Sequence, residues 1–365
     1  MEENSSYKDI IKENMKETVS SERRLQRERI VNKRRGILGK VKINKNEFLK
    51  TDDVKSIAQR LKHKGLVKDS DFKLLTRAFI QNENNIIAFA NSDGALQSLI
   101  RELTGTDSNH QLLAAECCVN LALGNEKTSL KIAKSAGTYL ITFLKGMSIP
   151  LSSAAIWALG NLAGSDVKTL ELLKSQGLME SLLDIIGVED LQSNVIYALM
   201  HFVKVGLPVL QPDDLKKIAT RTVVLANRTP DTFWLLYYLS CSNVCDELLL
   251  PIVQPCIGII AETDESDTIE SIKKKTACVR ILANLASAES GNVASLLMAE
   301  FDTLFSLFEY MAQEATTPHL CKDMLWMFGN LVNHPAECVR SQVQMNMMRL
   351  QHLDLLCIPL RNELK

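Results

Sequence analysis

The most constraining feature of this 365-residue chain is a pattern that returns about every forty residues. A short apolar segment follows a glycine at Gly94, Gly137 and Gly177, which lie 43 and 40 residues apart. A second register, marked by Asn-Leu-Ala or Asn-Leu-Val triplets, recurs at steps of 37 to 46 residues. Its positions are Asn120, Asn161, His201, Tyr238, Asn284 and Asn330, with His201 and Tyr238 in the place of the asparagine. Such self-similarity indicates a repeat array, in which each unit buries its apolar face only against its neighbours.

The repeated unit is helical. From about Asp52, apolar residues recur at three- and four-residue spacing, and the alternation typical of strands is scarce. A helical period of about 40 to 47 residues is typical of armadillo and HEAT repeats. We therefore predict an all-α protein, a right-handed armadillo-repeat superhelix (an α-solenoid) over residues 51–350. A basic, largely disordered arm (1–50) precedes it and a tail (351–365) follows it. An irregular helical bundle is the alternative.

The second register also predicts a functional surface. The residue four positions before each register position lies one helical turn away on the same face. Each pair therefore forms one rung of a ladder, which a curved stack presents in its concave groove. All three tryptophans of the chain fall on rungs, although packing between helices is an alternative role for them. The rungs are Glu116/Asn120, Trp157/Asn161, Tyr197/His201, Trp234/Tyr238, Arg280/Asn284 and Trp326/Asn330.

A formal net charge of −1 conceals a strongly basic segment. Residues 21–50 carry eleven Lys or Arg and three Glu, a net charge of +8. The stretch from Tyr7 to Arg35 has no Pro or Gly, so it can form a helix on a partner, but alone it lacks the apolar area that offsets ordering entropy. A solvated tail is one alternative, and contact with nucleic acid or a membrane surface is another. Because aromatic residues are not interleaved and the body is acidic, we favour a protein partner.

At the second rung the chain resembles a known family. The segment Trp157-Ala-Leu-Gly-Asn161-Leu-Ala-Gly is similar to the groove motif of the importin-α armadillo repeats, and the order of the later rungs resembles that family as well. The resemblance covers about residues 20–345. It implies that the indoles flank Lys and Arg stems of an extended nuclear localisation signal, and that the asparagine amides pair with the peptide backbone. It further implies that acidic groove residues select the charge, with Asp166 as the candidate.

The arm resembles the importin-β-binding segment of the same family, which ends in a Lys-Arg-Arg cluster. This resemblance implies that the arm becomes a helix inside importin-β and that its last cluster can occupy the chain's own groove. The residues concerned are Arg23, Arg24, Arg27, Arg29, Lys33, Arg34 and Arg35. Two rungs depart from the family pattern: Glu116 stands where a tryptophan is expected, and Tyr197/His201 replace a Trp/Asn pair.

Other chemistry finds little support in the sequence. Nine cysteines without regular spacing and a polar N-terminus favour reduced thiols in an intracellular protein. No uncharged apolar stretch reaches the ~20 residues that span a bilayer. The pairs Cys241/Cys245 and His334/Cys338 are separated by about 90 residues, which exceeds common zinc-ligand spacings. No phosphate loop, dinucleotide motif or nucleophile motif is present, so we expect neither enzyme activity, metal nor cofactor.

The sequence thus predicts a nuclear import adaptor, with a non-transport armadillo scaffold for protein–protein interaction as the alternative. The predicted partners are an importin-β-like karyopherin and basic cargo proteins, with no nucleic acid and no membrane insertion. We expect a monomer that works in the cytoplasm and the nucleus.

Overall fold

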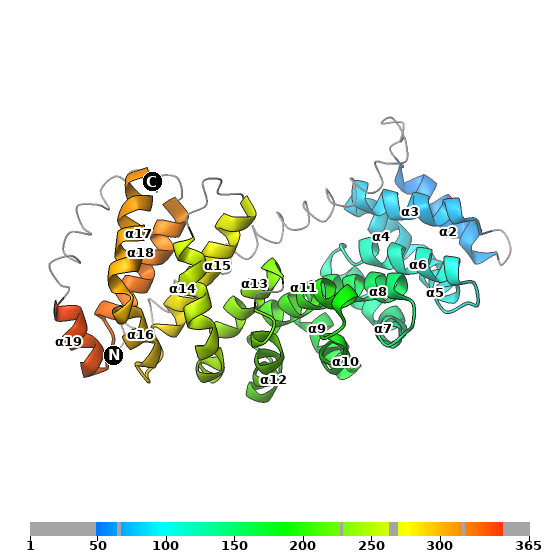
Figure 1. Cartoon of the computed structure of the whole chain (residues 1–365). Coiled ribbons are helices and arrows are strands. Elements are labelled where there is room, and N and C mark those ends of the chain that lie inside the picture. The colour runs from blue at the N-terminus through cyan, green and yellow to red at the C-terminus, as the bar shows by residue number, and fades with distance from the viewer. Residues whose placement is uncertain (1–48, 64–66, 227–228, 263–268, 315–317, 346–365) are drawn as a thin grey trace. The chain divides into compact units, whose positions relative to one another are not determined.

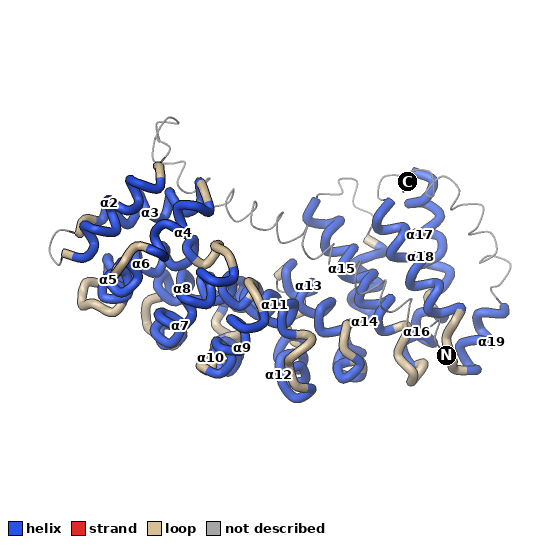
Figure 2. Tube along the Cα trace, turned by 180° about the vertical axis from the view of Figure 1, so that it is seen from behind, coloured by secondary structure: helices blue, strands red, loops and turns tan. Residues whose placement is uncertain are grey.

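The computed structural model describes residues 49–63, 67–226, 229–262, 269–314 and 318–345. Throughout these ranges the regular elements are helices and no strand occurs (Figure 2). The all-α class predicted from the sequence is therefore confirmed. The basic arm, apart from its last two residues, and the predicted C-terminal tail lie outside the described residues.

The chain divides into two compact units, Met1–Ala136 and Gly137–Lys365. The helix α7, which Figure 1 labels, begins before this boundary in the sequence and ends after it. The helices of the first unit, with α7, are α2 (Thr51–Lys62), α3 (Asp69–Gln81), α4 (Glu83–Asn91), α5 (Ala95–Leu103), α6 (Ser108–Leu121) and α7 (Glu126–Phe143).

The second unit is also built of helices. Its elements are α8 (Ile149–Ala163), α9 (Val167–Ser175), α10 (Leu178–Ile185), α11 (Glu189–Gly206), α12 (Pro212–Val223), α13 (Pro230–Ser240), the 3₁₀ helices η1 (Asn243–Cys245) and η2 (Glu247–Ile252), α14 (Val253–Ala261), α15 (Ile269–Leu285), α16 (Asn292–Ala299), α17 (Phe301–Glu314), α18 (Pro318–Val332) and α19 (Glu337–Met345).

Helix α8 illustrates how the sequence builds the stack. It has Pro150 in its first turn, where the missing N–H breaks no helical hydrogen bond. Between Ala154 and Ala163 every residue except Trp157 is buried. A helix that is apolar on nearly all sides is stable only between neighbours, and α8 accordingly packs against α9 and α11.

The glycine register marks a helix start at two of its three positions. Gly94 and Gly177 have φ angles of 69° and 88° and stand directly before α5 and α10. Glycine adopts this left-handed conformation without the penalty that a Cβ atom brings. Gly137, by contrast, lies inside α7, which is continuous from Glu126 to Phe143. One glycine lowers helix stability by only about 1 kcal/mol relative to alanine, so the helix continues through it.

A cluster of buried phenylalanine rings lies near the C-terminal end of the described chain. Helices α17 and α18 lie side by side (Figure 1). Phe328 of α18 is buried against three rings of α17, with centroid distances of 5.7 Å to Phe301, 6.0 Å to Phe305 and 5.8 Å to Phe308. These rings join the last two long helices.

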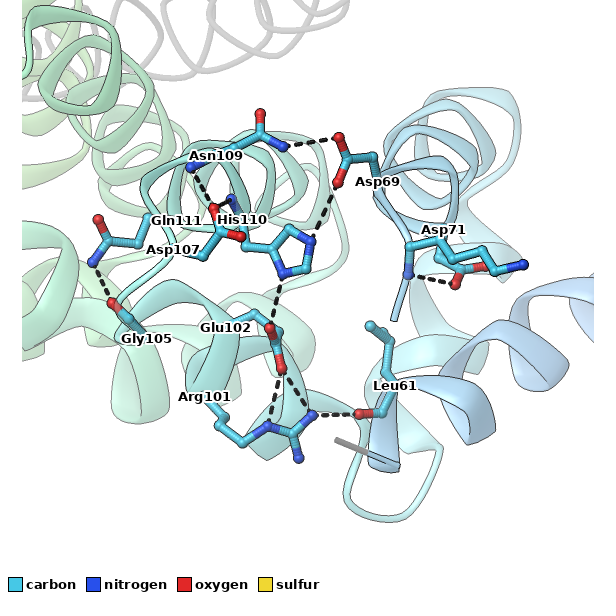
Figure 3. Close-up of polar contacts among 11 residues, drawn as sticks. Leu61, Asp69, Asp71, Arg101, Glu102, Gly105, Asp107, Asn109, His110 and Gln111 are labelled. Atoms are coloured by element: carbon cyan, nitrogen blue, oxygen red, sulfur yellow. Dashed lines mark hydrogen bonds and ion pairs between the residues drawn. The ribbon is translucent and has the colours of Figure 1, made fainter. Parts of the chain in front are cut away.

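Polar contacts join the helices of the first unit (Figure 3). The ring of His110, at the start of α6, lies between two carboxylates: Nδ1 is 3.1 Å from Glu102 of α5, and Nε2 is 3.2 Å from Asp69 of α3. Glu102 also accepts hydrogen bonds from Arg101, whose guanidinium donates to the Leu61 carbonyl of α2 at 2.6 Å. This connected set of ion pairs and hydrogen bonds joins four helices, α2, α3, α5 and α6.

Candidate functional site

The predicted rungs lie on long helices that pack in succession. In the second unit α8 packs against α11, α11 against α13, α13 against α15, and α15 against α18. These helices carry five rungs, from Trp157/Asn161 to Trp326/Asn330. In the first unit α6 carries Glu116/Asn120 and packs against α3. We call the helices α8, α11, α13, α15 and α18 of the second unit the ladder helices, and the face that carries their rungs the ladder face.

The asparagine amides connect neighbouring helices. Asn120 donates to the Thr76 carbonyl of α3 at 2.8 Å, and its Oδ1 is buried without a hydrogen bond from the described residues. Asn284 donates to the Ser240 hydroxyl at 2.9 Å, and Asn330 to the Ala283 carbonyl at 2.7 Å. In each case the acceptor lies on the preceding long helix. These amides therefore stabilise the stack, whatever else they bind.

The second and third rungs form one aromatic cluster. The Trp157 and Tyr197 rings lie 5.2 Å apart at an interplanar angle of 32°, and the His201 ring is 4.5 Å from Tyr197. The Tyr197 hydroxyl donates to Asn161 Oδ1 at 2.8 Å. Tyr197, His201 and Asn161 are buried, and Trp157 is partly exposed with a buried Nε1. The structure therefore brings these four predicted residues into direct contact.

The fourth and fifth rungs are joined by cations of the chain itself. The Arg280 guanidinium lies 5.8 Å from the Trp234 ring centroid and 5.7 Å from that of Tyr237, and its Nε donates to Asp323 of α18 at 2.8 Å. The Lys204 ammonium of α11 lies 5.5 Å from the Tyr238 ring centroid. A cation over an aromatic face is attracted by the ring quadrupole, so internal charges already cover these rings.

The last rung is different, because Trp326 is 45% exposed. No ring contact or cation–π contact of Trp326 occurs within the part of the chain that the structure describes. Asp323 lies one turn before it on α18. Of the three tryptophans, Trp326 offers the most open indole on the ladder face.

The acidic residue expected to select charge acts as a helix cap. Asp166 is the N-cap of α9 and accepts hydrogen bonds from the Thr169 amide at 3.1 Å, the Thr169 hydroxyl at 2.6 Å and the Ser165 hydroxyl at 2.9 Å. Partial burial alone would raise the pKa of the Asp166 carboxyl. The bonds from Thr169, Ser165 and the Lys168 amide outweigh burial and hold this pKa below the ordinary value of 3.8.

Replacing Asp166 by alanine is expected to destabilise the protein by about 0.5–2 kcal/mol at neutral pH, as for other helix N-caps. Because the folded-state pKa is lowered, this stabilisation is fully present above the unfolded value of 3.8 and is lost as the pH falls through the folded-state pKa. Urea titrations at several pH values measure the effect. Asp166→Asn is the control, since its amide oxygen still caps but does not titrate; an equal loss in both variants would contradict the assignment.

Two of the described cysteines are held in the unreactive thiol form by burial. Burial raises the pKa of the Cys241 thiol to about 12 and that of Cys245 to about 11. The thiolate is the form that attacks or ligates. Among the described residues no group of three or more His, Cys, Asp or Glu is placed to hold a metal ion. Nor is any described helix both long and apolar enough to cross a bilayer.

Three further residues contact the rungs but are not among the site residues predicted from the sequence. Lys204, Tyr237 and Asp323 all contact predicted rung residues. Lys204 follows His201 by three residues and Asp323 precedes Trp326 by three, so helical periodicity places both on the same face as a rung. Tyr237 follows Trp234 by three residues, so the same spacing places it beside that rung.

The fold and its ladder define an armadillo-repeat α-solenoid, although no protein-family model matches the chain. Importin subunit alpha-9 of Arabidopsis thaliana is 24% identical over 273 residues, which is 70% of this chain and 51% of that protein. The chain thus spans about half the length of this curated relative.

Solved structures support the same fold. An engineered protein aligns with a TM-score of 0.63 at 18% identity, covering 80% of this chain and 71% of its own. A designed armadillo repeat protein, solved in complex with the peptide (KR)4, aligns with a TM-score of 0.53 at 16% identity, covering 63% and 99%. These likenesses confirm the armadillo-repeat architecture predicted from the sequence.

Proposed function

We propose that the chain is an importin-α-like nuclear import adaptor. Its ladder face binds the extended, basic peptide of a localisation signal, and its N-terminal arm binds an importin-β-like karyopherin. The observation that supports this most is the indole of Trp326, which is exposed on a ladder helix one turn before Asn330. An open indole beside an amide suits a cationic side chain on an extended backbone.

The comparisons supply further support. The curated relative is an importin alpha subunit, and a solved structural neighbour holds a peptide of alternating Lys and Arg. The remaining predictions follow from the adaptor role: basic cargo proteins, a monomer in the cytoplasm and the nucleus, and neither catalysis, cofactor, nucleic acid nor membrane insertion. The other rung residues and Asp166 stay proposed residues of the peptide-binding groove.

Trp326→Ala is expected to weaken the binding of a (KR)4 peptide about tenfold, or about 1.4 kcal/mol. The physical reason is the loss of a cation–π contact, worth about 0.5–2 kcal/mol, together with the apolar surface under the Lys or Arg stem. Fluorescence anisotropy of a labelled peptide measures the affinity.

Binding of the peptide by the unmodified protein is expected to weaken when salt rises from about 0.1 M to about 1 M, because the Debye length falls from about 10 to about 3 Å.

Tyr310→Ala is the matched control for this measurement. Tyr310 is 60% exposed in the neighbouring helix α17, which is not a ladder helix. Its removal should leave peptide affinity unchanged. Equal losses in both variants, or no binding by the unmodified protein, would remove the support for a basic-peptide site at Trp326.

A non-transport armadillo scaffold is the second candidate. One observation favours it: groups of the chain itself already cover the rings of Trp157 and Trp234. A scaffold that uses apolar anchors would bind its partner with little dependence on salt, whereas an adaptor for basic cargo would not.

We also propose a finer relationship. Within this type of protein, the chain resembles transmembrane and coiled-coil domain-containing protein 6. The segments that carry the likeness are 140–144, 233–239 and 325–331. An alignment of the two sequences should then place a Tyr/His pair at the rung of Tyr197/His201, and a Trp/Asn pair there would reject the relationship.

A further inference from the structure

The strongest unassigned feature of the ladder face is the way in which α11 covers α8. The Tyr197 ring lies 5.2 Å from the Trp157 indole at only 32° between the planes, so it covers one face of that indole. His201 packs edge-on behind Tyr197 at 4.5 Å. Both Tyr197 and His201 are buried. The stem of a Lys or Arg residue could reach this face of Trp157 only by displacing Tyr197.

The amide of this rung is also engaged. The Tyr197 hydroxyl donates to Asn161 Oδ1 at 2.8 Å. This oxygen is the acceptor that an extended peptide's N–H would use. A single side chain thus covers the indole and binds the amide oxygen of one rung.

The close approach of the two helices fixes this arrangement. A Cβ atom on Gly160 would lie 3.0 Å from Ala198 Cα and 3.2 Å from Tyr197 Cδ1. A Cβ atom on Gly164 would lie 2.9 Å from His201 Nδ1. Glycine at both positions therefore provides the space that the α11 side chains fill. One turn before Tyr197, the α11 residue Asn194 hydrogen-bonds to Ser153 of α8, so contacts on both sides of Trp157 hold Tyr197 in place.

We propose that Tyr197 is a specificity-determining residue that closes the Trp157/Asn161 rung to cationic side chains. This inference rests on the proposed function, in which a basic peptide binds the ladder face. It assigns the peptide's cation contact to the open indole of Trp326 and makes Trp157 a structural residue. A ligand cation at Trp157 would have to displace a buried ring and its hydrogen bond.

The first test uses no peptide. Trp234→Phe with Trp326→Phe leaves Trp157 as the only tryptophan, so acrylamide quenching of the fluorescence reports its exposure. Adding Tyr197→Ala is expected to raise the quenching constant at least twofold. Adding Tyr197→Phe, which keeps the ring and removes the hydroxyl, is expected to leave it unchanged. An unchanged constant in a folded Tyr197→Ala protein would overturn the closure.

The second test locates the peptide in the full chain. Three indole N–H signals are expected in a ¹H–¹⁵N spectrum, and single Trp→Phe variants assign them. On titration with (KR)4, the Trp326 signal should shift and the Trp157 signal should stay. In Tyr197→Ala the Trp157 signal should shift as well, and affinity should rise about threefold.

The outcomes separate the two proposals. A Trp157 shift in the unmodified chain, with weaker binding by Trp157→Phe, would overturn the closure while leaving peptide binding intact. An absence of binding in every protein would overturn the proposed function, and the quenching test would still decide the role of Tyr197. If Tyr197→Ala does not fold, as its circular dichroism would show, the signals of the unmodified chain and of Tyr197→Phe still support or overturn the closure.

Discussion

Alanine at six cations of the N-terminal arm is expected to abolish the binding of importin-β by the full chain. The substitutions lower the net charge of residues 21–50 from +8 to +2. Charge-complementary association gains both rate and specificity from such clusters, and this gain is lost when the charges are removed. A pull-down with immobilised importin-β at modest salt measures the effect. The six residues are Arg23, Arg24, Arg27, Lys33, Arg34 and Arg35.

A second arm variant controls for charge alone. Alanine at Lys40, Lys42, Lys45 and Lys50 removes four cations that follow the glycines at 36 and 39. These lie beyond the Lys-Arg-Arg cluster, so binding should be retained. Loss of binding in this control would point to nonspecific charge attraction. Failure of the unmodified chain to bind would reject the adaptor and favour the scaffold.

Phe328→Ala is expected to destabilise the second unit by about 3–5 kcal/mol, the range for a buried phenylalanine cut to alanine. The ring is buried and contacts Phe301, Phe305 and Phe308 of α17, so its removal leaves a cavity between α17 and α18. Urea unfolding followed by far-UV circular dichroism measures the loss.

The same helix supplies the control for this prediction. Trp326 lies two residues before Phe328 and is 45% exposed, so Trp326→Ala should change stability far less. Similar losses in the two variants, or a loss below about 1 kcal/mol for Phe328→Ala, would show that the aromatic cluster does not hold the last helices together.

The recurring register and helical periodicity were enough to predict the repeat and to put the two residues of each rung on one helix. A register of Asn or its substitutes every 37 to 46 residues places each rung on a long helix, because four-residue spacing is one turn. The continuity of α7 was harder to predict. Gly137 disfavours a helix at its position, whereas the residues on both sides of it favour one. Local sequence indicates breakers, but it does not say whether the flanking residues outweigh them.

Contacts between rungs could not be predicted in the same way. Nothing near Trp157 in the sequence reveals that Tyr197, forty residues later, covers its ring. Likewise the position of Arg280 over Trp234 depends on how closely α13 and α15 approach and on the partner carboxylate of Asp323. Such contacts depend on backbone separation, which is a property of the packed helices and not of the local pattern.

The backward direction of the asparagine bonds has a consequence for synthesis on the ribosome. Asn120, Asn284 and Asn330 each bind an acceptor that lies 44 to 47 residues earlier in the chain. Translation adds about 5–20 residues per second. The asparagine that binds each acceptor is therefore synthesised roughly 2–9 s after the acceptor itself. Each of the three helices that carry these acceptors therefore leaves the ribosome before the amide that it will bind.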